Sequence, residues 1–240
     1  MLRLTHLAVL LSLAAAHAFA GEVYITNFTK TNNMQTALQS AYPSGLFTAS
    51  SAFGTTFDII NDVNGHNFLE AGTSTTSIAG LSLYGIADVY MLANAYAPTG
   101  GTIATVEFKG DAGADQVFNL VNGSDIRDFY QGSFLNSINN TTTKNAFSVS
   151  NVFGGAGTGN VNTGAFGTYI IDEVQFGLSS AFRTQNLTQI DITNAGCCGT
   201  LIVMGITADT GSTTPEPAAA SLMGLGLAGL ALAVRRRRAH

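Results

Sequence analysis

Hydrophobic and polar residues alternate along much of the chain, with the period of two that is typical of half-buried β-strands. In the segment Thr102–Lys109, one face is apolar and carries Ala104, Val106 and Phe108. The opposite face is polar and carries Thr105, Glu107 and Lys109. Because successive side chains of a strand point to opposite faces, this segment is expected to be a strand with one face in the core.

The same reasoning predicts about ten strands. Asn186–Asn194 alternates in the same way, and Thr200–Ala208 is a more fully apolar strand. The other candidates are Val23–Asn27, Thr56–Asn61, Ala87–Asn94, Gln116–Val121, Asn145–Val152 and Tyr169–Leu178. A turn at Gly110–Gly113 makes Thr102–Val121 a hairpin, and Asn33–Ala41 is expected to form a helical turn or two. The predicted fold class is all-β, a two-sheet jelly-roll-like sandwich.

The first 20 residues have the order of a secretion signal. Arg3 precedes an apolar run at Leu7–Ala16, and the small residues Ala18 and Ala20 stand at alternate positions before the expected cut. Signal peptidase is therefore expected to cleave after Ala20 and to leave Gly21 as the mature N-terminus. A first transmembrane helix is the alternative, but about ten strongly apolar residues are too few to span a bilayer comfortably.

Three features follow one another in the C-terminal segment 215–240. They are Pro215, Glu216 and Pro217, then the uncharged run Ala218–Val234, then Arg235, Arg236, Arg237 and Arg238. As a transmembrane helix, the run 218–234 rises about 25 Å, near the lower limit for crossing a bilayer. The basic end 235–238 is expected to stay in the cytoplasm, which places the main domain outside.

This order of features resembles the PEP-CTERM sorting signal, which exosortase processes. The resemblance implies an inner-membrane-anchored precursor in a Gram-negative-type bacterium and cleavage near Pro215–Pro217. It also implies delivery to the cell surface or extracellular matrix. An ordinary membrane anchor is the alternative. Between the two ends, residues 21–214 are expected to form one exported domain.

The exported domain is acidic. Between Gly21 and Thr214 there are fourteen acidic and five basic residues, a net charge of −9. Nucleic-acid binding is therefore not expected, because a domain this acidic has no basic surface for phosphates. Charged residues are only 10% of the chain, so solubility depends on Asn, Thr, Ser and Gly as much as on ions.

Four segments within the domain carry a second resemblance. They are Val89–Asn94, Ala104–Phe108, Asp125–Asp128 and Val152–Gly155. Together they resemble a jelly-roll ectodomain that recurs among PEP-CTERM proteins, and they are similar to galactose-binding-like sandwiches associated with glycans. The resemblance implies a sandwich fold and favours sugar as a ligand.

The residues of the domain give little support for catalysis. Its single histidine, His66, lies in a turn-like sequence, and motifs for a serine nucleophile, a zinc protease or a phosphate-binding loop are absent. A glycosidase needs only two carboxylates at a set distance, and the adjacent pair Asp172 and Glu173 is one example. We expect no enzymatic activity, with a carbohydrate-active hydrolase or lyase as the alternative.

The candidate ligand-binding residues lie close together in the sequence, and they are Asp125, Arg127, Asp128, Phe129 and Tyr130. Their polar groups suit sugar hydroxyls. Aromatic rings stack on sugar rings, and Phe129 with Tyr130 is the preferred platform because the chain has no Trp. The alternative is structural, with Arg127 pairing with a nearby carboxylate to fix a loop.

Cys197 and Cys198 are adjacent and have three open fates. They can form a vicinal disulfide, stay as buried free thiols, or pair with another chain. No cofactor or metal site is expected apart from a candidate calcium site at Asp111 and Asp115. The sequence thus predicts a non-enzymatic surface or matrix protein that associates with extracellular polysaccharide. A purely structural coat protein is a further alternative.

Overall fold

The structure is a computed structural model that describes residues 21–32, 42–62, 64–131, 137–153 and 166–211. Residues Glu22–Gly211 form one unit, which we call the body. The signal segment 1–20, the expected helical segment 33–41 and the tail 215–240 lie outside the described residues.

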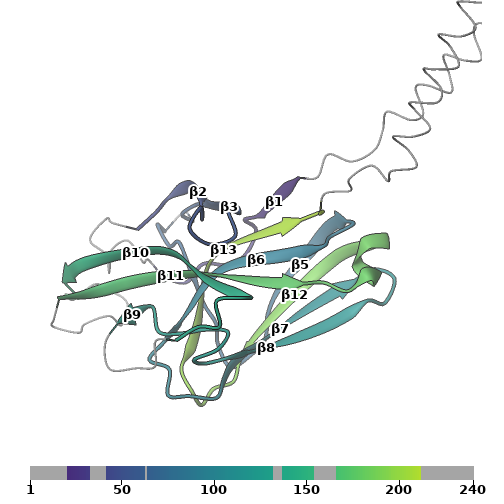
Figure 1. Cartoon of the computed structure of the whole chain (residues 1–240). Coiled ribbons are helices and arrows are strands. Elements are labelled where there is room, and N and C mark those ends of the chain that lie inside the picture. Colours follow the sequence, from purple (N-terminus) through teal and green to yellow (C-terminus); the bar gives the residue numbers. More distant parts are fainter. Residues whose placement is uncertain (1–20, 33–41, 63, 132–136, 154–165, 212–240) are drawn as a thin grey trace, which may run out of the picture. The chain divides into compact units, whose positions relative to one another are not determined.

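The described part of the body is built almost entirely of strands (Figure 1). They are β1 (Glu22–Ile25), β2 (Gly45–Thr48), β3 (Thr56–Ile59), β4 (Leu69–Glu70), β5 (Thr76–Tyr84), β6 (Asp88–Tyr96), β7 (Thr102–Gly110), β8 (Asp115–Val121), β9 (Tyr130–Gln131), β10 (Thr143–Phe153), β11 (Phe166–Gly177), β12 (Asn186–Asn194) and β13 (Thr200–Asp209). A short 3-10 helix, η1 (Ser180–Thr184), leads into β12.

The strands form three antiparallel sheets. The large sheet has the order β1-β13-β6-β11-β10, with β4 also paired to β13 and β9 to β11. A second sheet has the order β5-β12-β7-β8, and β2 pairs with β3 in a small sheet. In the large sheet the first and last strands are neighbours, because Glu22 pairs with Asp209 and Ile25 pairs with Ile206.

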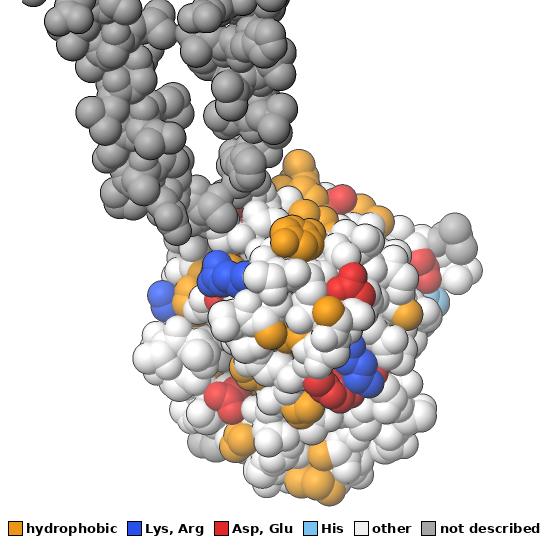
Figure 2. Space-filling model, turned by 90° about the vertical axis from the view of Figure 1, so that its right-hand side faces the viewer, with side chains coloured by type: hydrophobic (Ala, Val, Ile, Leu, Met, Phe, Trp, Pro, Cys, Tyr) orange, Lys and Arg blue, Asp and Glu red, His pale blue; other side chains and the backbone are white. Residues whose placement is uncertain are grey.

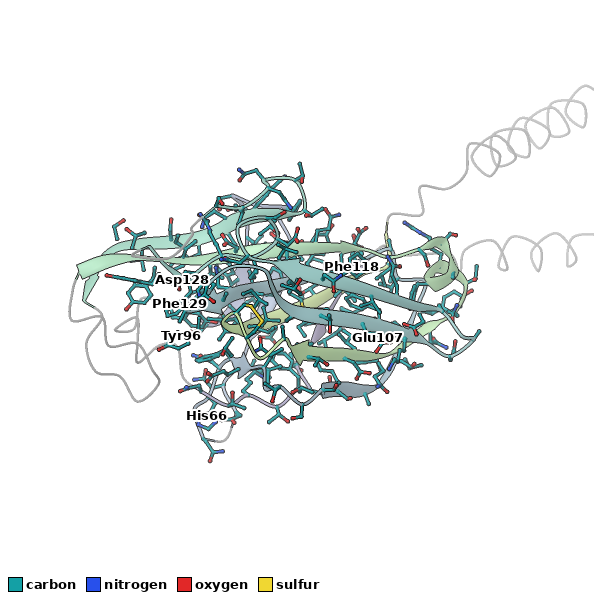
Figure 3. The ribbon with its side chains drawn as sticks, turned by 90° about the horizontal axis from the view of Figure 1, so that it is seen from below. His66, Tyr96, Glu107, Phe118, Asp128 and Phe129 are labelled. Atoms are coloured by element: carbon teal, nitrogen blue, oxygen red, sulfur yellow. A yellow bond between two sulfur atoms is a disulfide. The ribbon has the colours of Figure 1, made fainter. Side chains whose placement is uncertain are left out.

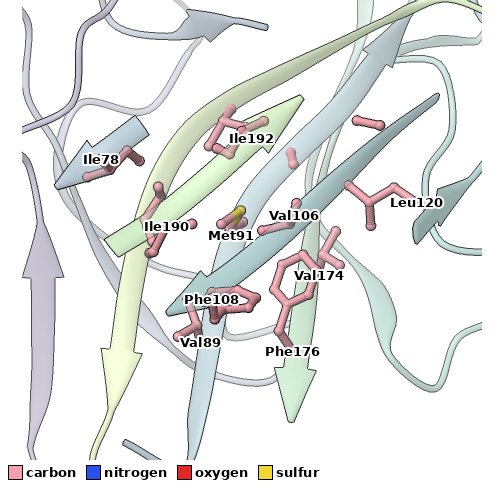
Figure 4. Close-up of a cluster of buried hydrophobic side chains, with 14 of the residues drawn as sticks. Ile78, Val89, Met91, Val106, Phe108, Leu120, Val174, Phe176, Ile190 and Ile192 are labelled. Carbon is pink, nitrogen blue, oxygen red and sulfur yellow. The ribbon is translucent and has the colours of Figure 1, made fainter. Parts of the chain in front are cut away.

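The main core lies between the large sheet and the four-stranded sheet (Figure 4). The four-stranded sheet contributes Ile78, Val106, Phe108, Ile190 and Ile192, and the large sheet contributes Val89, Met91, Val174 and Phe176. All of these side chains are buried, and the rings of Phe108 and Phe176 are 5.4 Å apart between centroids. The alternating pattern of the sequence therefore directs one face of the four-stranded sheet into the core.

A second core covers the other face of the large sheet. Phe57 and Ile59 of β3 pack there with Ile202 and Met204 of β13. The strand β13 is consequently buried on both faces, which explains why its sequence is apolar at nearly every position. Gly205 allows this packing, because a Cβ at that position would lie only 3.2 Å from Phe57 Cδ1.

The structure confirms the prediction of an all-β sandwich. All nine segments predicted as strands overlap a strand of the body, and β7 and β8 form the expected hairpin with Gly113 at a positive φ of 87° in the turn. The sequence reasoning missed β2, β4, β5 and β9. In β5 the alternation is broken at Gly80, which has a φ of 75° near a register shift against β12.

Candidate functional site

Arg127 is the centre of a buried polar network that ties the loop between β8 and β9 to the large sheet. Its Nε donates to Asp172 Oδ2 at 2.7 Å, and its Nη2 donates to Asp172 Oδ1 at 2.6 Å. Asn94 of β6 and Asn145 of β10 also donate to the Asp172 carboxylate, at 3.0 and 3.4 Å. The β8–β9 loop, β6 and β10 therefore all contact one carboxylate on β11.

The bidentate pair of Arg127 and Asp172 has a structural role. The side chain of Arg127 is 11% exposed and that of Asp172 is fully buried. Burial raises the pKa of Asp172, and the hydrogen bonds and positive charge of Arg127 oppose that shift. A buried carboxylate needs such a partner. The structural alternative for Arg127 is therefore correct in kind, although the partner is a distant strand residue.

The structure places two residues of the expected ligand platform in the interior. Phe129 is 4% exposed and packs with Tyr169 and Tyr96 in the second core, and Asp128 is 2% exposed. Figure 3 shows Asp128, Phe129 and Tyr96 on one side of the body. Burial raises the pKa of Asp128 to about 6, and its Oδ1 accepts a hydrogen bond from the Tyr130 backbone N at 3.2 Å. Phe129 and Asp128 are therefore interior residues, and Tyr130 alone of the three is partly exposed.

Asp125 holds the same loop together. Its Oδ2 accepts a hydrogen bond from the backbone N of Val121 at 3.1 Å, and its Oδ1 accepts one from Asn139 Nδ2 at 3.2 Å. These contacts close the turn after β8 and attach it to the chain before β10. Asp125 thus stabilises the loop from within, and sugar binding at this loop stays a prediction.

Asp172 and Glu173 point to opposite sides of β11. Asp172 faces Arg127, whereas Glu173 Oε2 accepts a hydrogen bond from the backbone N of Phe53, at 3.0 Å, in the loop that precedes β3. Burial also raises the pKa of Glu173. Because neighbouring residues of a strand face opposite ways, these two carboxylates do not form a pair around one substrate.

The most regular exposed polar surface is the outer face of the four-stranded sheet, the face turned away from the core. Its side chains line up across the strands in three rows: Thr75, Thr193, Thr105 and Asn119; Ser77, Asp191, Glu107 and Val117; Ala79, Gln189, Lys109 and Asp115. All are exposed or half-buried except Asp191, which is 6% exposed. Rigid strands about 4.8 Å apart therefore present hydroxyl, amide and carboxylate groups in fixed positions.

Three of the four charged side chains on the outer face form one cluster. Lys109 Nζ lies 2.7 Å from Asp191 Oδ2 and 2.9 Å from Glu107 Oε2. The hydrogen bonds to Asp191 and Glu107 raise the pKa of Lys109 above its usual range. Gln189 Nε2 donates to both Asp191 oxygens at 2.8 Å. Figure 3 shows Glu107 well away from Asp128. The sequence signal for this site was the polar half of the alternation at positions 105, 107 and 109.

Asp111 and the two cysteines lie in loops at opposite ends of β12. Asp111 Oδ2 accepts a hydrogen bond from Asn186 Nδ2 at 2.6 Å. Among the described residues, no group of three or more His, Cys, Asp or Glu side chains is placed to hold a metal ion, and calcium at Asp111 and Asp115 stays a prediction.

The structure joins Cys197 to Cys198 by a disulfide in the β12–β13 loop, with Cys197 exposed (Figure 3).

Both targeting segments fall mainly outside the described residues. The residues outside the described ranges include Ala18 and Ala20 at the expected signal cut and every residue of the expected sorting motif, whereas Gly21 is described. Within the ranges that the structure describes, no helix is long and apolar enough to cross a membrane. The expected membrane helix at 218–234 is not part of those ranges.

The fold and the outer face define the body as a β-sandwich module. Residues 213–238 match the family model of the PEP-CTERM protein-sorting motif. The chain therefore carries a PEP-CTERM sorting motif, which implies export, sorting through a membrane-anchored precursor and processing by exosortase. Neither the curated proteins nor the solved structures contain a match to the chain. The resemblance of the body to galactose-binding-like sandwiches stays a prediction.

Proposed function

We propose that the body is a non-enzymatic module that associates with extracellular polysaccharide through the outer face of the four-stranded sheet. The sorted protein would then act at the cell surface or in the extracellular matrix. The observation that carries the proposal is the set of three polar rows on rigid strands. Hydroxyl, amide and carboxylate groups held at fixed spacing suit the many hydroxyls of an extended glycan.

The two sheets differ in a way that supports this choice of surface. The large sheet is covered on both faces by the two cores. Within the part of the chain that the structure describes, the four-stranded sheet uses one face for packing, and its other face is rich in threonine. Val117, which is 55% exposed, adds an apolar surface for the carbon side of a sugar ring.

Retention of the protein on matrix polysaccharide from the producing cells tests the proposal. The variant Thr105→Glu places a larger charged side chain on the outer face, in the row that Thr105 shares with Thr193 and Asn119. The matched control is Ser148→Glu, since Ser148 is exposed on β10 of the other sheet. We expect Thr105→Glu to weaken retention at least about tenfold and the control to leave it unchanged. Loss of a buried hydrogen-bond partner costs about 1–3 kcal/mol, and a tenfold change in affinity corresponds to about 1.4 kcal/mol.

The other outcomes of this experiment identify the other functions. Failure of the unmodified protein to bind any fraction would contradict the binding proposal and favour a structural coat protein. Release of reducing ends from the polysaccharide, abolished by a single carboxylate substitution, would favour a hydrolase. Unsaturated sugar products would favour a lyase.

Mass spectrometry of the protein recovered from cells and medium tests the proposed delivery. We expect the surface-exposed form to begin at Gly21 after signal peptidase cleavage and to end near Pro215–Pro217. A surface-exposed form that still carries Arg235–Arg238 would contradict proteolytic sorting before delivery.

A further inference from the structure

The charges of the outer face restrict the class of polysaccharide that it can bind. The face carries three carboxylates, those of Asp115, Glu107 and Asp191, and a single ammonium group, that of Lys109. The ammonium group contacts two of the carboxylates, at 2.7 and 2.9 Å. An acidic sugar would have to displace one of these partners before it gained an ion pair with Lys109.

The rest of the body supplies no basic group to this face. Its other basic residues are Lys30, Arg127, Lys144 and Arg183, and all of them lie outside the four-stranded sheet. Arg127 is held by Asp172, and Lys144 Nζ lies 4.3 Å from the ring centroid of Phe53. Figure 2 shows one side of the body with few charged side chains on a mostly uncharged surface.

Long-range electrostatics act in the same direction. The exported domain carries a net charge of −9. Such a field repels polyanions and lowers their rate of association. Uncharged sugars do not feel this repulsion, and the hydroxyl and amide groups of Thr105, Thr193, Asn119 and Gln189 are the partners that their hydroxyls require.

We infer that the outer face binds a neutral polysaccharide and rejects polyanionic ones such as polyuronates. This inference rests on the proposed function and specifies its ligand. Recognition then depends on hydrogen bonds and apolar contact, so that binding changes little with salt. An electrostatic mode would instead weaken steeply as salt rises.

The test uses matrix polysaccharide from the producing cells, separated by anion exchange into neutral and acidic fractions. The exported protein is passed over each immobilised fraction in the presence of a chelator, which prevents divalent cations from bridging carboxylates. We expect retention on the neutral fraction at low and high salt, and at least about tenfold weaker retention on the acidic fraction. Stronger retention on the acidic fraction would overturn the inference but leave the proposed function standing. Retention on neither fraction would overturn the proposed function itself.

A variant with the reverse preference sharpens this test. Glu107→Gln with Asp191→Asn removes both carboxylates that hold Lys109 and leaves its ammonium group without them. We expect this double variant to gain low-salt retention on the acidic fraction. The single variant Glu107→Gln is the backup if the double variant does not fold, and circular dichroism checks the fold of each. A folded variant with no gain would contradict the role assigned to the paired charges.

Discussion

The two main sheets of the body differ in how many of their faces are buried. In the large sheet, β13 is buried at eight of its ten positions, because a core lies on each face. In the four-stranded sheet, β7 buries Ile103, Ala104, Val106 and Phe108, and its polar positions stay half exposed. The buried polar groups of the large sheet, such as Asp172, therefore serve stability, whereas most polar groups of the outer face are exposed or half-buried. This difference predicts that substitutions at buried positions of the large sheet change stability more than substitutions on the outer face.

The largest effect is expected at the buried ion pair. Arg127→Met leaves the Asp172 carboxylate without its charged partner in the interior, and we expect the free energy of unfolding at neutral pH to fall by about 3–5 kcal/mol. Urea denaturation measures the change. Arg183→Met is the control, because Arg183 is exposed and its replacement should change stability by less than about 0.5 kcal/mol. Equal losses of stability from both variants would contradict the structural role of the buried ion pair.

The close approach of the second core to β13 gives the next effect. Gly205→Ala adds a Cβ that lies 3.2 Å from Phe57 Cδ1, and we expect a loss of about 1–3 kcal/mol in the free energy of unfolding. Gly72→Ala is the matched control, since no atom lies closer than 3.8 Å to its added Cβ. Thermal and urea unfolding of both variants would show whether β13 is as tightly covered as described.

Asp128 gives stability a dependence on pH. Its pKa of about 6 in the folded protein lies above the value of about 3.9 expected after unfolding. The folded protein therefore retains this proton to higher pH. The contribution of Asp128 to the free energy of unfolding is fully present below about pH 4 and is lost as the pH rises through 6, by about 3 kcal/mol in all.

Asp128→Asn removes the titrating group and supplies the comparison for this pH dependence. The difference in the free energy of unfolding between the native protein and Asp128→Asn, followed from pH 4 to 7, measures the contribution of Asp128. A difference that stays constant over this range would show that Asp128 is more exposed to water than the structure places it.

The smallest effect is expected at the paired charges of the outer face. Lys109→Met removes the ammonium group of a side chain that is 37% exposed, and exposed ion pairs add little to stability. Asp191, its less exposed partner, keeps the hydrogen bonds from Gln189 in this variant. We expect the midpoint of urea unfolding to stay within experimental error of that of the native protein. A loss as large as that of Arg127→Met would show that the outer face serves stability after all.

The fold was predictable because the alternation along β7, β8 and β12 is regular. The fully apolar run at Thr200–Ala208 also marked a strand, although its burial between two cores depends on β3, which lies far away in the sequence. Strand β5 escaped prediction because Gly80 interrupts its pattern. Local sequence patterns thus identified the strands. Whether a strand is buried on one face or on both depends on contacts with residues far away in the sequence.

The candidate site was less predictable than the fold. Polar and aromatic residues clustered at positions 125–130 look the same in a sequence whether they face solvent or brace a loop. What decided between these roles was Asp172, which lies 45 residues away from Arg127 and captures its guanidinium. The outer face showed the opposite problem, since its rows consist of residues from four strands that are adjacent only after folding.

The pairing of β1 with β13 makes the order of events during export important. The two strands stand at opposite ends of the body's sequence, so that their contact closes the longest loop that the domain contains. A chain still threading through the secretion channel has its first strand outside and that strand's partner inside. During this interval the edge of β6 that later pairs with β13 has unpaired backbone groups, which could pair with another extended chain. This risk of aggregation ends when β13 pairs with β6.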